Sequence, residues 1–75
     1  MGWNYRVIKR TFVTNTGNRE NQFGIYEVYY NDDGKPISCT SEPVEPVGET
    51  LEEFKKSLES YTAALTKPVL EYEDF

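Results

Sequence analysis

Residues 50–65 read TLEEFKKSLESYTAAL, the one segment of the chain with a clear helical period. Its large apolar residues recur at spacings of three and four, which places them on one stripe of an α-helix: Leu51, Phe54, Leu58, Tyr61 and Leu65. We therefore predict an amphipathic helix over residues 51–65, which packs against a sheet formed by the residues before it.

Both ends of this helix are marked in the sequence. Thr50 is followed by Glu53, the spacing of a capping box. In that motif the threonine oxygen accepts a hydrogen bond from the Glu53 amide, and the glutamate side chain accepts one from the Thr50 amide. Pro68 has no amide hydrogen and restricts the residue before it, so we expect the helix to end before Lys67.

The residues before the helix predict strands. Residues 3–13 are rich in aromatic and β-branched residues and alternate, with Trp3, Tyr5 and Val7 on one face and Arg6 and Arg10 on the other. Residues 22–30, QFGIYEVYY, give the strongest strand signal. The pair Asp33-Gly34 favours a hairpin turn, and a weaker edge strand is expected over residues 35–41 because of its prolines.

The predicted fold is a single α+β domain over residues 1–75. It has a three-stranded antiparallel sheet (β-β-β) followed by one C-terminal amphipathic helix packed on one face of the sheet. The segment after Pro68 is compatible with a short extra strand, and residues 71–75 form an acidic C-terminal tail.

The central strand carries large side chains on both of its faces. Phe23, Ile25 and Tyr29 alternate with Tyr26, Val28 and Tyr30, and one helix can cover only one face of the sheet. Aromatic residues left in water mark an interaction surface. We therefore expect the open face to bind a second copy or an unidentified protein partner. The expected anchors are aromatic, because Trp and Tyr dominate interface hot spots: Trp3, Tyr26, Tyr29 and Tyr30.

Charge leaves a second interpretation open. The net charge is −5, yet residues 1–19 carry four basic and no acidic side chains. Arg6 and Arg10 flank Ile8 on one strand face, where Phe12, Phe23 or Tyr29 could lie beside them. Such a surface is typical of single-stranded nucleic-acid binding, which is the alternative function. The acidic total disfavours it, because nucleic-acid affinity rests on phosphate neutralisation.

Catalytic signals are weak. The chain has no histidine, and its one cysteine, Cys39, has only lysines and carboxylates as candidate bases. We predict no catalytic, cofactor-binding or metal-binding residues and no enzymatic activity. A lone cysteine and the absence of a signal peptide or membrane span predict a cytoplasmic location.

Four stretches together resemble a set of short bacterial and phage proteins with no assigned function: WNYRVIKR, GIYEVYYNDDGKPIS, GETLEEFKKSLE and KPVLEYEDF. More remotely, residues 48–58 after a run of strands are similar to the N-terminal domain of HicB-type antitoxins. That resemblance implies a small sheet with a helix on one side, a domain that masks a partner toxin in those proteins. Neither resemblance implies catalytic or binding residues.

Overall fold

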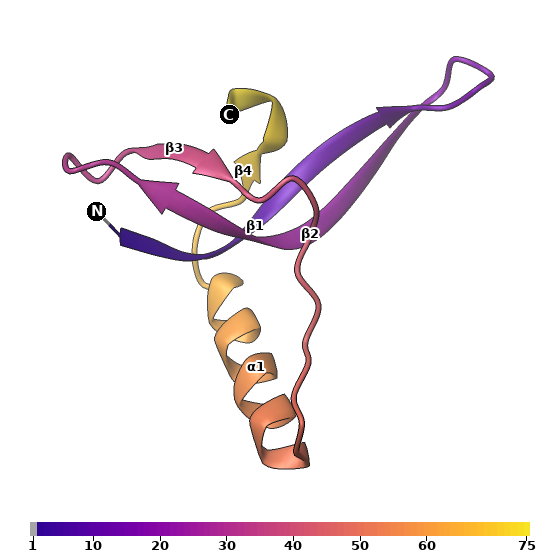
Figure 1. Cartoon of the computed structure of the whole chain (residues 1–75). Coiled ribbons are helices and arrows are strands. Elements are labelled where there is room, and N and C mark those ends of the chain that lie inside the picture. The colour runs from indigo at the N-terminus through magenta and orange to yellow at the C-terminus, as the bar shows by residue number, and fades with distance from the viewer. Residues whose placement is uncertain (1) are drawn as a thin grey trace.

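The computed structural model describes residues 2–75 and contains a four-stranded sheet and one α-helix (Figure 1). The elements in chain order are β1 (Gly2–Val13), β2 (Arg19–Tyr30), β3 (Pro36–Cys39), α1 (Leu51–Ala64), β4 (Leu70–Glu71) and a 3₁₀ turn, η1 (Tyr72–Asp74). The fold is therefore α+β.

The sheet is mixed and has the order β3-β2-β1-β4, so the expected sheet of three antiparallel strands is wrong in strand number and direction. β1, β2 and β3 pair antiparallel, whereas β4 pairs parallel with β1 through Ile8↔Leu70 and Lys9↔Glu71. A parallel neighbour requires a long connection. Here β2, β3, the connector (residues 40–50) and α1 all lie between β1 and β4 in the chain. The two residues of β4 are too few to give a periodic signal. The sequence therefore allowed a short strand after Pro68 but did not indicate its parallel pairing with β1.

β1 and β2 form one long hairpin that extends beyond the other strands (Figure 1). β2 begins at Arg19, before the expected residue 22, because the polar residues next to the turn continue the ladder: Thr11↔Asn21, Phe12↔Glu20 and Val13↔Arg19. Gly17, with φ of 85°, closes the turn in a conformation that glycine adopts without strain. Backbone pairing alone therefore extends this hairpin.

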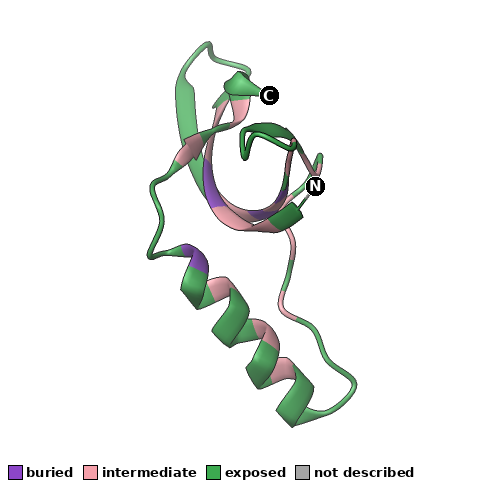
Figure 2. Ribbon diagram, turned by 90° about the vertical axis from the view of Figure 1, so that its left-hand side faces the viewer, coloured by how far each residue is buried: buried purple, intermediate pink, exposed green. Residues whose placement is uncertain are grey.

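The sheet curls, and its concave side holds the main core (Figure 2). Ile8, Tyr26 and Val28 are almost completely buried there. The C-terminal segment (residues 70–75) covers them, with the Tyr72 ring centroid 5.9 Å from that of Tyr26. The expectation that the face opposite the helix would stay open is therefore wrong at its centre, because residues after α1 fold back over it.

Helix α1 lies on the convex side and contacts β1 with its C-terminal end (Figures 1 and 2). Ala64 is buried and the rings of Tyr61 and Tyr5 meet edge to face, with centroids 4.7 Å apart. The other end of the helix projects away from the sheet and packs on its own connector. The connector runs alongside the helix, where the Ser57 hydroxyl donates to the Val47 carbonyl and the Tyr61 hydroxyl donates to the Glu45 carbonyl, both at 2.9 Å.

The apolar stripe of α1 is therefore only partly buried, which corrects the expectation of a helix packed along the sheet. Phe54 and Tyr61 are half-buried, whereas Leu51, Leu58 and Leu65 remain exposed. The convex side of a curled sheet offers a straight helix only a short line of contact, and here that contact is made by one end.

The start of α1 confirms half of the capping box. The Glu53 amide donates to Thr50 Oγ1 at 3.1 Å, as expected. The Glu53 carboxylate instead accepts from the amide of Glu49 at 3.0 Å, one residue before the expected donor. The extended connector therefore enters the helix with the Glu49 amide turned toward the first turn.

Replacing Thr50 with alanine should lower the free energy of unfolding by about 1 kcal/mol, because the Glu53 amide loses its acceptor. Urea unfolding followed by circular dichroism measures this change. Thr50→Ser keeps the oxygen and should stay close to the wild type. An equal loss in both variants would show that the hydroxyl does not stabilise the helix.

Among residues 2–75, no helix has the length and apolar character needed to cross a membrane.

Candidate interaction surface

A row of four rings runs from β2 across β1 to α1 on the convex side of the sheet. Trp3 and Tyr29 are cross-strand partners, Trp3 meets Tyr5 edge to face at 5.3 Å, and Tyr5 meets Tyr61 at 4.7 Å. We call Tyr29, Trp3, Tyr5 and Tyr61 the aromatic row. Each edge-to-face pair contributes about 0.5–1.5 kcal/mol beyond its buried area, so the row helps hold the helix to the sheet.

The two ends of the aromatic row differ in exposure. Tyr5 and Tyr61 are half-buried, whereas Trp3 is 54% exposed and Tyr29 is 36% exposed. The Tyr29 hydroxyl donates to Glu27 Oε1 at 3.3 Å, and partial desolvation and the nearby Glu27 charge raise the pKa of Tyr29. The hydroxyl therefore stays protonated at neutral pH. The exposed end offers two amphipathic rings and a hydrogen-bond donor.

The Arg6 side chain, a candidate for nucleic-acid binding, donates hydrogen bonds to other parts of the chain. Its guanidinium donates to the Tyr30 hydroxyl at 3.0 Å and to the Pro68 carbonyl at 2.7 Å. The Tyr30 hydroxyl in turn donates to Asn4 Oδ1 at 2.7 Å. Arg6 and Tyr30 therefore tie β1 and β2 to the segment that leads into β4.

Arg10 is also engaged on the concave side. Its guanidinium lies 4.0 Å from the Tyr72 ring centroid and donates to the Ser41 carbonyl at 2.9 Å. A hydrogen bond with the Tyr26 hydroxyl is the main cause that raises the pKa of Arg10, and Glu42, 3.8 Å away, adds to it. Arg10 thus joins β1 to the connector and to η1.

The structure therefore places the six predicted interaction residues in different environments. Tyr26 is 1% exposed and cannot contact a partner. Arg6, Arg10 and Tyr30 take part in the contacts just described. Only Trp3 and Tyr29 lie side by side with accessible rings. Phe12, Phe23 and Tyr29 were expected as possible neighbours of the arginines. The Arg10 guanidinium carbon lies 5.0 Å from the Phe12 ring centroid. The strand register places Phe23 and Tyr29 on the convex side, away from both arginines.

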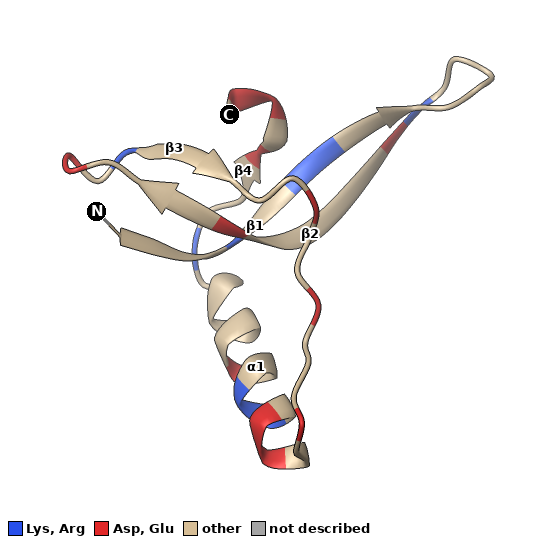
Figure 3. Cartoon of the chain, in the orientation of Figure 1, with Lys and Arg blue, Asp and Glu red and all other residues tan. Residues whose placement is uncertain are grey.

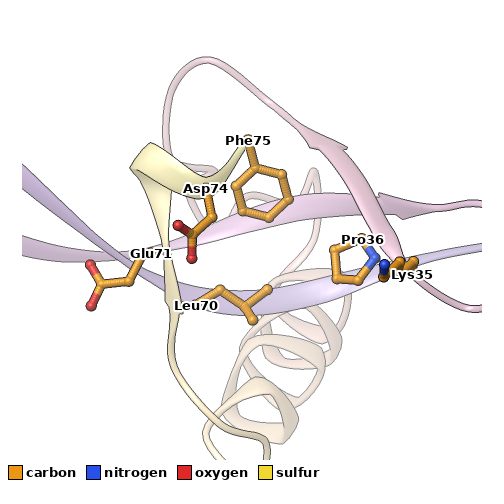
Figure 4. Close-up of a pocket in the computed structure, with 6 residues that line it drawn as sticks. All are labelled: Lys35, Pro36, Leu70, Glu71, Asp74 and Phe75. Atoms are coloured by element: carbon orange, nitrogen blue, oxygen red, sulfur yellow. The ribbon is translucent and has the colours of Figure 1, made fainter.

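A pocket of about 350 Å³ lies between the start of β3 and the C-terminal segment (Figure 4). Its lining is half charged and half apolar: Lys35, Pro36, Leu70, Glu71, Asp74 and Phe75. Glu71 is also 3.9 Å from Lys9, which partly neutralises it. The lining includes no histidine, cysteine or hydroxyl group, so it offers charge and apolar contact but no thiol or hydroxyl nucleophile and no imidazole base.

Cys39 is the one thiol of the chain and lies partly buried against the concave core. Burial raises the pKa of this thiol, and the opposing effect of Arg10 is smaller. The thiol form therefore predominates at neutral pH, whereas a nucleophilic cysteine needs a lowered pKa. Across residues 2–75, no cluster of three or more His, Cys, Asp or Glu side chains is arranged to hold a metal ion.

Charge is segregated along the chain, as Figure 3 shows. The basic residues of the first third lie on β1 and β2, and acidic residues follow the connector, the start of α1 and the C-terminal segment. In the fold the two sets meet only locally, at Arg10–Glu42 and Lys9–Glu71 among the described residues.

Comparisons of the chain with protein-family models, with curated proteins and with solved structures found no match.

Proposed function

We propose that this protein is a non-enzymatic protein-interaction module that self-associates or docks a partner protein through surfaces on its convex side. The observation that carries the proposal is the pair Trp3 and Tyr29, adjacent on β1 and β2 and accessible to a partner. Both residue types are enriched at the energetic centres of interfaces, where they combine apolar area with a polar group.

The shape of the chain supports an interaction role. Its radius of gyration is 14.0 Å, compared with about 11 Å for a compact domain of this length. The difference arises from the long β1–β2 hairpin and from α1, which projects from the sheet (Figure 1). Extended elements of this kind leave apolar side chains uncovered that a partner can bury.

The alternative function, binding of single-stranded nucleic acid, receives no support from the arginine geometry. Both guanidinium groups donate hydrogen bonds within the chain, so phosphate binding would first have to break those contacts. The experiment below distinguishes this alternative from the proposed function.

The test uses the full chain as bait and compares the proteins it retains with those retained by a Trp3→Ala/Tyr29→Ala variant. Loss of both rings should weaken a specific complex by at least tenfold, because truncating a hot-spot residue costs about 2 kcal/mol or more. Val13→Ala, an exposed apolar position at the far end of β1, is the matched control and should bind like the wild type.

Two results would contradict the proposal. One is identical retention by the wild type and the double variant. The other is salt-sensitive binding of an oligonucleotide that is lost in an Arg6→Ala/Arg10→Ala variant, which would establish the nucleic-acid alternative.

A further inference from the structure

The apolar stripe of helix α1 has an edge that its own chain does not cover. Leu51, Leu58 and Leu65 are 69%, 41% and 69% exposed and are spaced seven residues apart, so they form one line along the helix. The side chains turned toward the connector and β1 lie on the neighbouring side of the helix: Phe54, Ser57, Tyr61 and Ala64. The leucine line, Leu51, Leu58 and Leu65, is therefore an unpartnered helix face.

The surface area of the chain fits a dimer. The accessible surface is 5638 Å², compared with about 4,700 Å² for a compact monomer of 8.7 kDa. The excess, about 900 Å², is close to the roughly 800 Å² that each partner buries in a standard stable interface. Part of this surplus lies on α1, which projects from the sheet (Figure 1), and a second copy packed along the leucine line would bury that part on both chains.

We propose that the leucine line is covered by the same line of a second copy, with the two helices antiparallel around a two-fold axis at Leu58. The spacing of seven on both sides of Leu58 makes the line symmetric about its centre. In this arrangement Leu58 packs on the partner's Leu58, and Leu51 packs on the partner's Leu65. A two-fold axis requires such a self-complementary patch.

The charges beside the leucine line also fit the antiparallel arrangement. At 3.6 residues per turn, Lys55 and Glu59 both lie on the flank of the line that faces away from Phe54 and Tyr61. In the antiparallel pair, Lys55 stands about 3 Å along the axis from the partner's Glu59, and the contact occurs twice. In a parallel pair the two-fold axis would instead place the charged flanks of the two helices on opposite sides of the seam, so Lys55 could not meet the partner's Glu59. Such pairs contribute little affinity but set orientation.

This inference deepens the proposed function by naming a second copy as one partner, and it rests on α1 rather than on Trp3 and Tyr29. The two can therefore fail separately. Loss of dimerisation leaves the Trp3 and Tyr29 surface available, and a Trp3→Ala/Tyr29→Ala variant should keep the dimer.

Sedimentation equilibrium of the full chain tests the dimer over about 1 μM to 1 mM, a range that brackets weak and transient complexes. The wild-type mass should rise from 8.7 kDa to twice that value. Leu58→Glu should weaken the dimer by more than about 100-fold, because two like charges then meet at the centre of the interface. Ser60→Glu adds the same charge on the opposite, exposed side of the helix and should leave the dimer intact.

A charge exchange keeps the proposal falsifiable even where Leu58→Glu disturbs folding. Lys55→Glu should weaken the dimer, and Lys55→Glu combined with Glu59→Lys should restore it. A wild-type mass of 8.7 kDa at every concentration would overturn the proposal. So would equal dimerisation of Leu58→Glu and Ser60→Glu, or a failure of the exchanged pair to restore what Lys55→Glu lost.

Discussion

Replacing Tyr26 with alanine is expected to unfold the protein at room temperature. Tyr26 is 1% exposed and packs among Ile8, Val28 and Tyr72 at the centre of the concave core. Truncating a buried aromatic residue costs about 3–5 kcal/mol. A domain of this size rarely has more than about 3–5 kcal/mol of stability in total. The loss therefore equals or exceeds what holds the chain folded.

Urea titration at low protein concentration, followed by near-UV and far-UV circular dichroism, measures this effect. Phe23→Ala is the matched control, since Phe23 is an aromatic residue on the same strand that lies 61% exposed on the other face. It should change the free energy of unfolding by no more than about 0.5 kcal/mol. Equal stability of the two variants would show that the concave core does not stabilise the fold.

Replacing Gly48 with alanine should give the second largest effect, through a steric conflict. A Cβ at this position would lie 2.5 Å from the Phe54 amide nitrogen and 2.9 Å from the Glu53 carbonyl carbon. These are backbone atoms of the first helical turn and cannot rotate away. The connector must therefore shift, which would disturb the Glu49–Glu53 hydrogen bond nearby. A clash of this kind costs about 1–3 kcal/mol.

Urea unfolding measures the free energy of unfolding of Gly48→Ala and of Gly2→Ala, and the difference between them reports the steric conflict at Gly48. A Cβ at Gly2 meets no atom within 4 Å, so that variant should behave like the wild type. A Gly48→Ala protein as stable as Gly2→Ala would mean that the connector is not held against the helix start.

The local elements were largely predictable because their signals are local. The helix period and the Thr50 cap are contained within a few residues, and so is the alternation that makes β1 and β2. The parallel strand β4 was not predictable in the same way, because a two-residue strand is defined by its neighbour β1 and not by its own side chains.

The candidate site was harder to predict because exposure depends on tertiary packing. Tyr26 and Tyr29 are similar in sequence terms, yet one is buried under η1 and the other is accessible beside Trp3. The stripe of α1 gave no indication that its leucines would be left uncovered. The spacing of seven from Leu51 to Leu65 was visible in the sequence, but a helix packed along a sheet would show it as well.

The central claim, an antiparallel helix pair around Leu58, is tested most directly by cysteine cross-linking in a Cys39→Ser background. A disulfide forms only where two Cα atoms lie within about 7 Å. Leu58→Cys should therefore cross-link to its own copy under mild oxidation. Leu51→Cys alone should not, because its copy lies about 21 Å along the axis, whereas Leu51→Cys mixed with Leu65→Cys should. Cross-linking of Leu51→Cys as fast as that of Leu58→Cys, or none at Leu58→Cys, would contradict the account.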